Sequence, residues 1–390
     1  MFSSFFLFFL LFFNVKSIKI PMSSNIDNFI INIFINENEY IPMIFNTGIE
    51  KSLIAAENCS ICKGGKYLPS SSSQLLKENI TQNLSHFIYR GDEYLQDFYL
   101  YSYEIYKLKL DYINFYDIKY KEETTIEGIF SLNFVNFNIE TEKKIFAIEY
   151  TNEGAYLDVG EINKNIVDDY SKLINFTVSI KNNSNENNSN IEWFLQAKNL
   201  KINNEQMPIE NPKIILDTFS YNFYIPKKFF FDNIDKIFPK KSRCQVQMSG
   251  TFICKCDENY KNYFSNFVFE FENGNKLFVN TTDYISYDSS ITGTNCFVYI
   301  IVNYNNDYFI AGNNVLNNYY SIFNVDEKIL SFYPLNNSNE KLQILLMFIV
   351  FSILSLVIFF GSYYLYKKYL SNFNNEINNI DNIEDAIHQE

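Results

Sequence analysis

The chain has 390 residues, and its 32 basic against 45 acidic residues leave a formal charge of −13. This balance excludes the basic footprint of a nucleic-acid-binding protein, and an apolar content of 47% excludes disorder over most of the chain. At about 150 residues per domain, the length allows two to three domains. The 40 Phe and 30 Tyr, together with many Asn residues, are interpreted first as A/T-rich codon bias, so Asn frequency carries little weight.

The first predicted element is a signal peptide, residues 1–17. Met1 to Phe13 form a short apolar run, and Val15 and Ser17 offer compact residues at −3 and −1 of a cleavage after Ser17. An uncleaved anchor is the alternative, although the run is short for spanning a bilayer. The signal peptide predicts entry into the secretory pathway.

The region after the signal peptide is dense in short runs of Ile, Phe, Tyr and Val between polar clusters. Period-two alternation predicts strands within residues 29–35, 99–110, 264–271 and 297–302. Helical periodicity is scarce outside residues 228–238 and the segment after Asn314. The sequence therefore predicts a mostly β fold with a few short helices.

Two similar patterns stand out in this region. In the first, an apolar strand over residues 40–45 ends in Asn46-Thr47-Gly48, and an apolar-apolar-small element follows at residues 127–132 (EGIFSL).

In the second pattern, a strand with an apolar end, residues 212–216 (PKIIL), leads into Asp217-Thr218-Phe219-Ser220, and residues 308–313 (YFIAGN) follow. Each half thus has a strand, an Asp or Asn followed by Thr, and a later apolar-apolar-small element. This repetition predicts an internal duplication.

The six cysteines are divided evenly between the halves. Cys59 and Cys62 form a C-x-x-C pair in the first half, and the second half contains the other four, Cys244, Cys254, Cys256 and Cys296. Disulfides are permitted in the secretory pathway, so each half could pair internally. A zinc site is the competing interpretation. With only His86 and His388 in the chain and the wrong ligand spacing, no metal is predicted.

Asn-X-Ser/Thr sequons predict glycosylation, although chance matches are expected in so Asn-rich a chain. They lie at Asn79, Asn83, Asn175, Asn182, Asn187, Asn280 and Asn336.

A transmembrane helix is predicted near the C-terminus, over residues 342–366. Leu342 to Phe360 contains no charge and as a helix would measure ~28 Å, close to the hydrocarbon thickness. Tyrosines then form an interfacial belt, followed by Lys367-Lys368 and a polar cytoplasmic tail, residues 367–390. This is the topology of a type I membrane protein with its main body lumenal or extracellular. A buried core helix is the alternative.

The two patterns resemble those of the pepsin-like aspartic protease family (peptidase A1 type), in which each of two lobes contributes an Asp-Thr-Gly turn to a shared cleft. Four further segments match the order of the family's motifs. They are residues 58–62 (NCSIC), 156–162 (YLDVGEI), 192–196 (EWFLQ) and 311–324 (AGNNVLNNYYSIFN). With a C-terminal anchor, the chain resembles the membrane-bound branch of the family.

The resemblance implies a bilobal pepsin-like fold, with an N-terminal lobe over residues 18–175 and a C-terminal lobe over residues 176–335. It also implies a peptide or protein segment in the interlobe cleft as partner, and no cofactor. Tyr89 is the candidate for the flap tyrosine. The family's cysteine loop implies Cys59 with Cys62, and its long second-lobe bridge favours Cys256 with Cys296 and Cys244 with Cys254.

The resemblance places the catalytic pair at Asn46 and Asp217, braced by Thr47 and Thr218. Hydrolysis in this family needs two carboxyls that share a proton. An amide has neither a basic site nor an acidic proton, so Asn46 cannot complete the pair. Without a like-charged neighbour, Asp217 is expected to titrate near ~3.9 if it is solvated.

Three further positions depart from the family pattern. Phe219 replaces a glycine, so its ring should reshape the turn or project into the cleft floor. Ile49 replaces a serine, and Ser131 replaces a glycine. Glu50 could substitute for the missing acid only with a rearranged backbone.

We therefore expect a catalytically inactive, membrane-anchored pepsin-like protein whose cleft is retained for peptide or protein binding. One alternative is an active aspartic endopeptidase with an atypical dyad. The other is a surface adhesion or structural glycoprotein in which the groove has no role.

Overall fold

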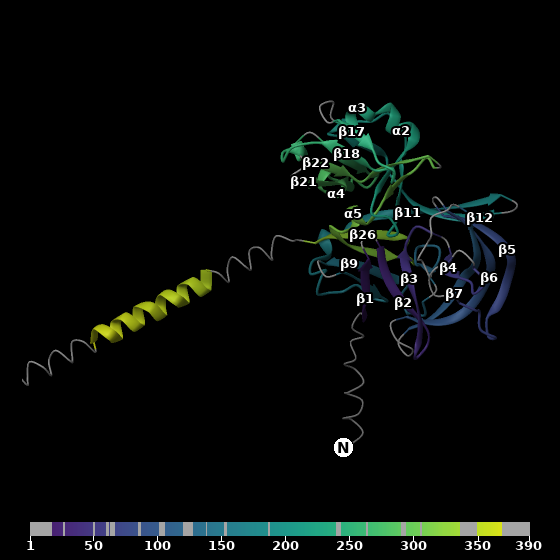
Figure 1. Ribbon diagram of the computed structural model, residues 1–390, viewed down its shortest axis with the longest axis horizontal. Coiled ribbons are helices and arrows are strands. Elements are labelled where there is room, and N and C mark those ends of the chain that lie inside the picture. The colour runs from purple at the N-terminus through teal and green to yellow at the C-terminus, as the bar shows by residue number, and fades with distance from the viewer. Residues whose placement is uncertain are drawn as a thin grey trace, which may run out of the picture. The chain divides into compact units, whose positions relative to one another are not determined.

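The computed structural model (Figure 1) divides the chain into two units, up to Pro334 and from Leu335, and each is described by itself. The predicted signal peptide, the tail beyond Lys368, Glu50 and the sequons at Asn187 and Asn336 lie outside the described residues. The structure describes residues 18–25, 28–49, 51–59, 62, 67–84, 87–100, 106–119, 128–137, 139–151, 154–185, 188–238, 243–262, 264–289, 294–304, 306–335 and 349–368.

The first unit is built mainly from strands, which confirms the predicted fold class. In chain order the strands of its first half are β1 (Ile18–Asn25), β2 (Asn28–Asn36), β3 (Glu39–Asn46), β4 (Ser52–Ala55), β5 (Gln74–Leu84), β6 (Phe87–Leu100), β7 (Tyr106–Lys119), β8 (Gly128–Ser131), β9 (Ile145–Thr151) and β10 (Gly154–Val159).

The second half continues with strands. The strands are β11 (Ile174–Asn185), β12 (Asn188–Gln196), β13 (Asn199–Ile202), β14 (Glu205–Gln206), β15 (Lys213–Leu216), β16 (Phe223–Pro226), β17 (Cys244–Val246), β18 (Phe252–Lys255), β19 (Phe267–Glu270), β20 (Lys276–Val279), β21 (Ile285–Asp288), β22 (Asn295–Val298), β23 (Ile300–Asn303), β24 (Phe309–Ala311), β25 (Tyr319–Asn324) and β26 (Ile329–Pro334). The helices are η1 (Tyr170–Lys172), α2 (Lys227–Asp232), α3 (Ile234–Ile237), η2 (Tyr260–Asn262), α4 (Thr281–Tyr284) and α5 (Asn313–Leu316). Two of them, α2 and α3, fall in the predicted helical segment at residues 228–238, whereas the segment after Asn314 is helical only up to Leu316 and then becomes a strand. The short helices at residues 170–172, 260–262 and 281–284 were not predicted.

The apolar run over residues 99–110 is not one strand. Leu100 ends β6 and pairs with Tyr106 at the start of β7, so the chain reverses between them. Alternation of apolar and polar residues continues through the turn sequence, and therefore the pattern alone does not reveal the reversal.

The predicted internal duplication is visible in the strand pairing. β3 pairs in parallel with β8, and β4 pairs in parallel with β7 and antiparallel with β8. The second half repeats this pattern, because β15 pairs in parallel with β24, and β16 pairs in parallel with β23 and antiparallel with β24. The lobe boundary at residues 175 and 176 stays a prediction.

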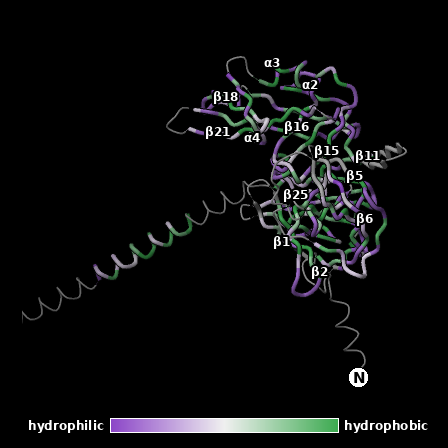
Figure 2. Tube along the Cα trace, turned by 45° about the vertical axis from the view of Figure 1, so that its right-hand side comes forward, coloured by the Kyte–Doolittle hydropathy of each residue, from purple (hydrophilic) through white to green (hydrophobic). Residues whose placement is uncertain are grey.

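Strands from both halves share one large sheet, in which β9 pairs with β25. At this junction Phe146 stacks on Phe323 with ring centroids 4.3 Å apart, and Trp193 meets Phe323 edge-on. Hydrophobic residues, green in Figure 2, recur along the strands. Because aromatic rings bury large apolar areas, this packing joins the two halves in one core.

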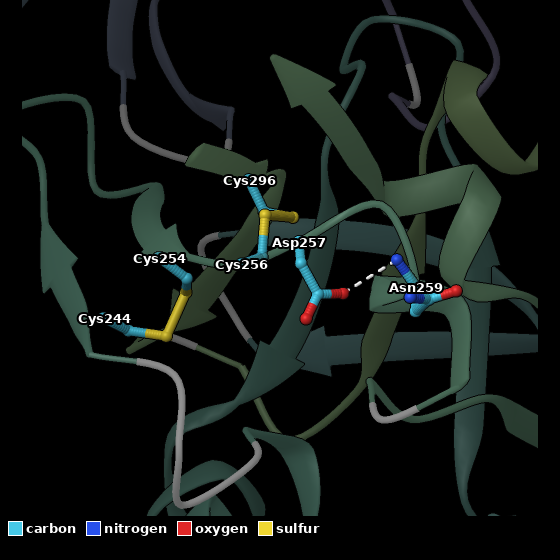
Figure 3. Close-up of a disulfide and its surroundings, with 6 residues drawn as sticks. All are labelled: Cys244, Cys254, Cys256, Asp257, Asn259 and Cys296. Carbon is cyan, nitrogen blue, oxygen red and sulfur yellow. Dashed lines mark hydrogen bonds between the residues drawn. A yellow bond between two sulfur atoms is a disulfide. The ribbon is translucent and has the colours of Figure 1, made fainter. Parts of the chain in front are cut away.

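Three disulfides are present, and they pair the cysteines as the family resemblance implies: Cys59–Cys62, Cys244–Cys254 and Cys256–Cys296. Figure 3 shows the latter two side by side. Cys254 is opposite Cys244 on β17 and opposite Cys296 on β22, so the two bridges staple neighbouring strands of one small sheet. Among the described residues, no group of three or more His, Cys, Asp or Glu could hold a metal ion.

The second unit contains a helix, Ile349–Lys368, that is long and apolar enough to cross a membrane. It overlaps the predicted transmembrane segment, whose first residues, 342–348, lie outside the described part of the chain. Its 20 residues would span about 30 Å at the rise of an α-helix.

The two bridges of the second half should differ in their contribution to stability. Cys256–Cys296 closes a loop with a sequence separation of 40, against 10 for Cys244–Cys254. Loop-closure entropy then predicts a loss of about 4 kcal/mol for C256A/C296A and about 3 kcal/mol for C244A/C254A. Urea unfolding of the full chain in detergent measures both, and equal losses would contradict the entropic account.

Candidate functional site

Each of the two turns follows a strand that is held by a parallel neighbour. Asn46 ends β3, and its carbonyl accepts the N–H of Leu132 at 3.0 Å. Asp217 follows β15 in the same way, and its N–H donates to the carbonyl of Ala311 at 3.0 Å. Both side chains are buried. The duplicated pairing therefore brings the ends of two strands, 171 residues apart, to equivalent positions.

Reciprocal threonine hydrogen bonds join the two turns. The N–H of Thr47 donates to Thr218 Oγ1 at 3.1 Å, and the N–H of Thr218 donates to Thr47 Oγ1 at 3.3 Å. Each hydroxyl also donates to a carbonyl on the opposite strand, Thr47 to Leu216 at 2.9 Å and Thr218 to Phe45 at 3.1 Å. All four bonds are buried, so the turns are fixed against each other as the resemblance implies.

Asn46 is held in one amide orientation. Its Oδ1 accepts the N–H of Gly48 at 2.5 Å and the N–H of Ile49 at 3.2 Å. Because backbone N–H groups need an acceptor, the oxygen must face them, and Nδ2 faces the other way. Nδ2 is buried and has no hydrogen-bond partner among the described residues.

Asp217 lies against the opposite turn. A Cβ added to Gly48 would lie 2.9 Å from Asp217 Cγ, so only glycine allows this approach. Asp217 Oδ1 accepts the N–H of Phe219 at 2.9 Å. Burial disfavours the charged carboxylate and raises the pKa of Asp217 to about 6, although the bond from Phe219 acts in the opposite direction. The condition for an ordinary pKa, a solvated carboxyl, is therefore not met, because burial desolvates the group.

The model of the eukaryotic aspartyl protease family matches residues 29–335 of the chain. The chain belongs to this family. A comparison with curated protein sequences found no match. The family assignment agrees with the two braced turns and with the mostly β fold.

Family members place an acid at each turn, whereas this chain offers one carboxyl and one amide. Asp217 can hold or release one proton near pH 6. Asn46 can donate from Nδ2 and accept at Oδ1, but it cannot exchange a proton at these pH values. The arrangement can therefore bind polar groups, but the described residues offer Asp217 no second carboxyl with which to share a proton.

Ile49 belongs to an apolar cluster against which Phe219 packs. We call it the Ile49 cluster; it consists of Ile49, Leu53, Ala55, Cys59, Cys62, Tyr89, Ile113, Phe115 and Ile129. Ile80 and the half-buried Phe219 pack against it. Phe219 does not have a positive φ, so its turn accommodates a side chain, and the ring projects onto the cluster.

Tyr89, the flap candidate, lies near the start of β6 and is 2% exposed. Its ring meets Phe115 edge-on with centroids 5.1 Å apart, and burial raises its pKa above the ordinary range of a tyrosine. The tip of the β5–β6 hairpin, residues 85 and 86, lies outside the described residues. The role of Tyr89 as a flap residue stays a prediction.

Polar residues around the turns complete the site. Ser131 Oγ donates to the carbonyl of Ile49 at 2.5 Å, so the serine that replaces glycine holds the first turn. Ser220 Oγ, behind the second turn, hydrogen-bonds the Tyr224 hydroxyl at 3.0 Å and accepts the N–H of Asn222 at 3.1 Å.

Two supporting residues were not predicted from the sequence. Trp193 Nε1 donates to the carbonyl of Thr47 at 2.8 Å, and Asn313 Nδ2 donates to the carbonyl of Thr218 at 2.7 Å. The single tryptophan carries a usable signal, since a buried indole N–H needs an acceptor. Asn313 belongs to the repeated element after β24, which also suggests a role at the turn.

The pKa of Asp217 predicts a stability that falls as pH rises. Its folded pKa of about 6 exceeds its ordinary value of 3.8, so the folded state binds more protons between these values. By linkage, the charge of Asp217 should remove up to about 3 kcal/mol between pH 4 and pH 7. Urea unfolding should show D217N gaining stability over the wild type across this range. A difference that is constant with pH would contradict the prediction.

The threonine brace gives a matched pair of variants. T218V keeps the shape of the side chain but leaves the N–H of Thr47 and the carbonyl of Phe45 without their partner. Since these groups are buried, we expect a loss of about 2 kcal/mol in urea unfolding. T218S retains the hydroxyl and should lose much less. A loss for T218V no larger than that for T218S would contradict the prediction, because T218V keeps the methyl group and lacks only the hydroxyl.

Proposed function

We propose that the chain is a membrane-anchored member of the aspartic protease family that does not hydrolyse peptides and that binds a peptide or protein segment in its cleft. The orientation of Asn46 carries the proposal. Gly48 and Ile49 hold its Oδ1, so an N–H donor takes the place of the second carboxylate oxygen. A general base must accept a proton at this place, which an amide N–H cannot do.

Retention of the binding cleft is supported by the state of the two turns. The four hydrogen bonds by which Thr47 and Thr218 join the two turns and their strands are all present. A protein that has lost hydrolysis does not need them for catalysis, so their presence favours another use of the cleft. The aspartic protease fold implies a substrate-binding cleft, and a peptide is the class of ligand that such a cleft accepts.

Membrane anchoring is supported by the apolar helix Ile349–Lys368, which ends in two lysines. A positive end favours the cytoplasmic side, which would place the β unit in the lumen or outside the cell. The three disulfides fit the secretory pathway. Asn79, Asn175 and Asn280 are exposed, as glycosylation would require.

An atypical endopeptidase is the second candidate function. The pKa of Asp217, about 6, suits a general base near neutral pH. In such a reaction Asp217 would take a proton from water while Asn46 Nδ2 donated to the scissile carbonyl. The ring of Phe219, one residue beyond Thr218, disfavours this reading because the attacking water needs open space above the turns.

The test of inactivity is a peptide-library digest by the full chain in detergent between pH 3 and pH 7. We expect no cleavage that pepstatin blocks. Cleavage that pepstatin blocks and that D217A lacks would contradict the proposal and support the atypical endopeptidase. D217A is the matched control, since it removes the remaining carboxyl and leaves residual contaminating proteases unchanged.

A paired reversion, N46D/F219G, tests what remains of the catalytic machinery. We expect it to gain pepstatin-sensitive cleavage below pH 6, because the second carboxyl restores the shared proton and the glycine removes the ring. N46D alone should gain less. If the pair gains nothing, the loss extends beyond the turns to the flap and the substrate-contacting residues.

A further inference from the structure

The Ile49 cluster connects the two turns by an apolar contact. The cluster itself consists of residues between Ile49 and Ile129, and Ile80 also packs against it. Phe219 alone comes from the second half of the chain. Its ring therefore reaches across from the turn that carries Asp217 to the side that carries Asn46.

Both large departures from the family's turn sequences take part in this contact. Ile49 stands where the family resemblance implies serine, and Phe219 stands where it implies glycine. A glycine at position 219 would have no ring to pack against the cluster, and a serine at position 49 would replace an apolar member of the cluster by a hydroxyl. The two substitutions therefore both add apolar surface to the same region.

The cluster that the ring packs against is built from paired strands. Tyr89 and Phe115 come from the paired strands β6 and β7, and Leu53 comes from β4 between β7 and β8. All three are fully or almost fully buried. Phe219 is only half-buried, so its ring rests on the surface of this cluster and is not part of the interior. A ring held in this way can leave without opening the core.

We propose that Phe219 occupies, within its own chain, a seat for a large apolar side chain of the bound peptide, so that the cleft is self-occluded until a peptide displaces the ring. The proposal rests on the proposed peptide-binding function and adds the ligand class and its regulation. The ligand is an extended peptide segment with a central aromatic or large aliphatic residue. Its affinity is set by competition with Phe219.

The competition can be measured as a change in affinity. When only a fraction of molecules has the seat free, the apparent Kd equals the intrinsic Kd divided by that fraction. If the ring is seated about nine-tenths of the time, its removal tightens binding about tenfold. A ligand without a large apolar side chain gains nothing from a free seat, so the effect should be selective.

The experiment uses the full chain in detergent and two fluorescein-labelled octapeptide pools with mixed flanks, one with Phe and one with Ser fixed near the centre. Anisotropy gives the Kd for the wild type, for F219A and for F231A. Phe231 is a matched control, since it is a phenylalanine that is 52% exposed on α2. We expect F219A to bind the Phe pool about tenfold more tightly than the wild type, with the Ser pool unchanged and F231A like the wild type.

The other outcomes separate this proposal from the proposed function. If the wild type binds the Phe pool and F219A binds it no more tightly, self-occlusion is overturned and peptide binding stands. If F219A gains equally for both pools, the seat has no apolar selectivity and the ligand class is wrong. If neither protein binds either pool, peptide binding fails together with the proposal.

A second variant keeps the proposal testable if F219A does not fold. F219W retains an aromatic ring on the seat, and its emission is compared with that of the wild type, whose single tryptophan, Trp193, is 3% exposed. Addition of the Phe pool should shift the new emission toward longer wavelength, because the displaced indole enters water. An unchanged spectrum on saturation with the Phe pool would overturn displacement.

Discussion

The position of both turns depends on the reciprocal hydrogen bonds between Thr47 and Thr218. Each hydroxyl accepts one N–H and donates to one carbonyl, so every polar atom of the pair is satisfied without water. Buried bonds of this kind tolerate little displacement, since a lost partner leaves an unsatisfied group. The brace contains no atom of the side chains at positions 46 and 217. The geometry of the site can therefore survive the loss of a catalytic acid.

The amide at position 46 is compatible with the surrounding hydrogen bonds for a simple reason. The two N–H groups of Gly48 and Ile49 need one acceptor oxygen, and an amide supplies it as well as a carboxylate does. What changes is electrostatic. Among the residues that the structure describes, no second carboxyl lies beside the buried Asp217, and desolvation raises its pKa to about 6. These residues thus give the site at most one negative charge near neutral pH, where an acid pair would meet mutual repulsion.

Period and repetition in the sequence are sufficient for the fold class and for the strands that end at Asn46 and Asp217. Alternation is a property of each strand, and the repeated strand-turn-element pattern predicts the duplication. The pairing of β3 with β8 and of β15 with β24 comes from the structure. The disulfide pairing follows from the family resemblance. Contacts between residues distant in the chain could not be predicted in this way. The residues around Trp193 do not indicate that its indole N–H donates to the carbonyl of Thr47, because the two groups meet only after both halves fold.

The contact between Ile49 and the region of Phe219 is the clearest case of what sequence reasoning could not reach. Each substitution, taken alone, indicates only that a family position has been lost. The structure places Phe219 against the cluster that contains Ile49, so both substitutions add apolar surface to one region. A glycine at position 219 serves catalysis by leaving room above the turns. If Asn46 removes the shared proton, as we propose, the space above the turns has no catalytic use. The ring of Phe219 then stabilises the self-occluded state of the cleft, because it buries apolar surface against the Ile49 cluster. The loss of hydrolysis and the self-occlusion that we propose would then both follow from one change in the side chains that the turns accommodate.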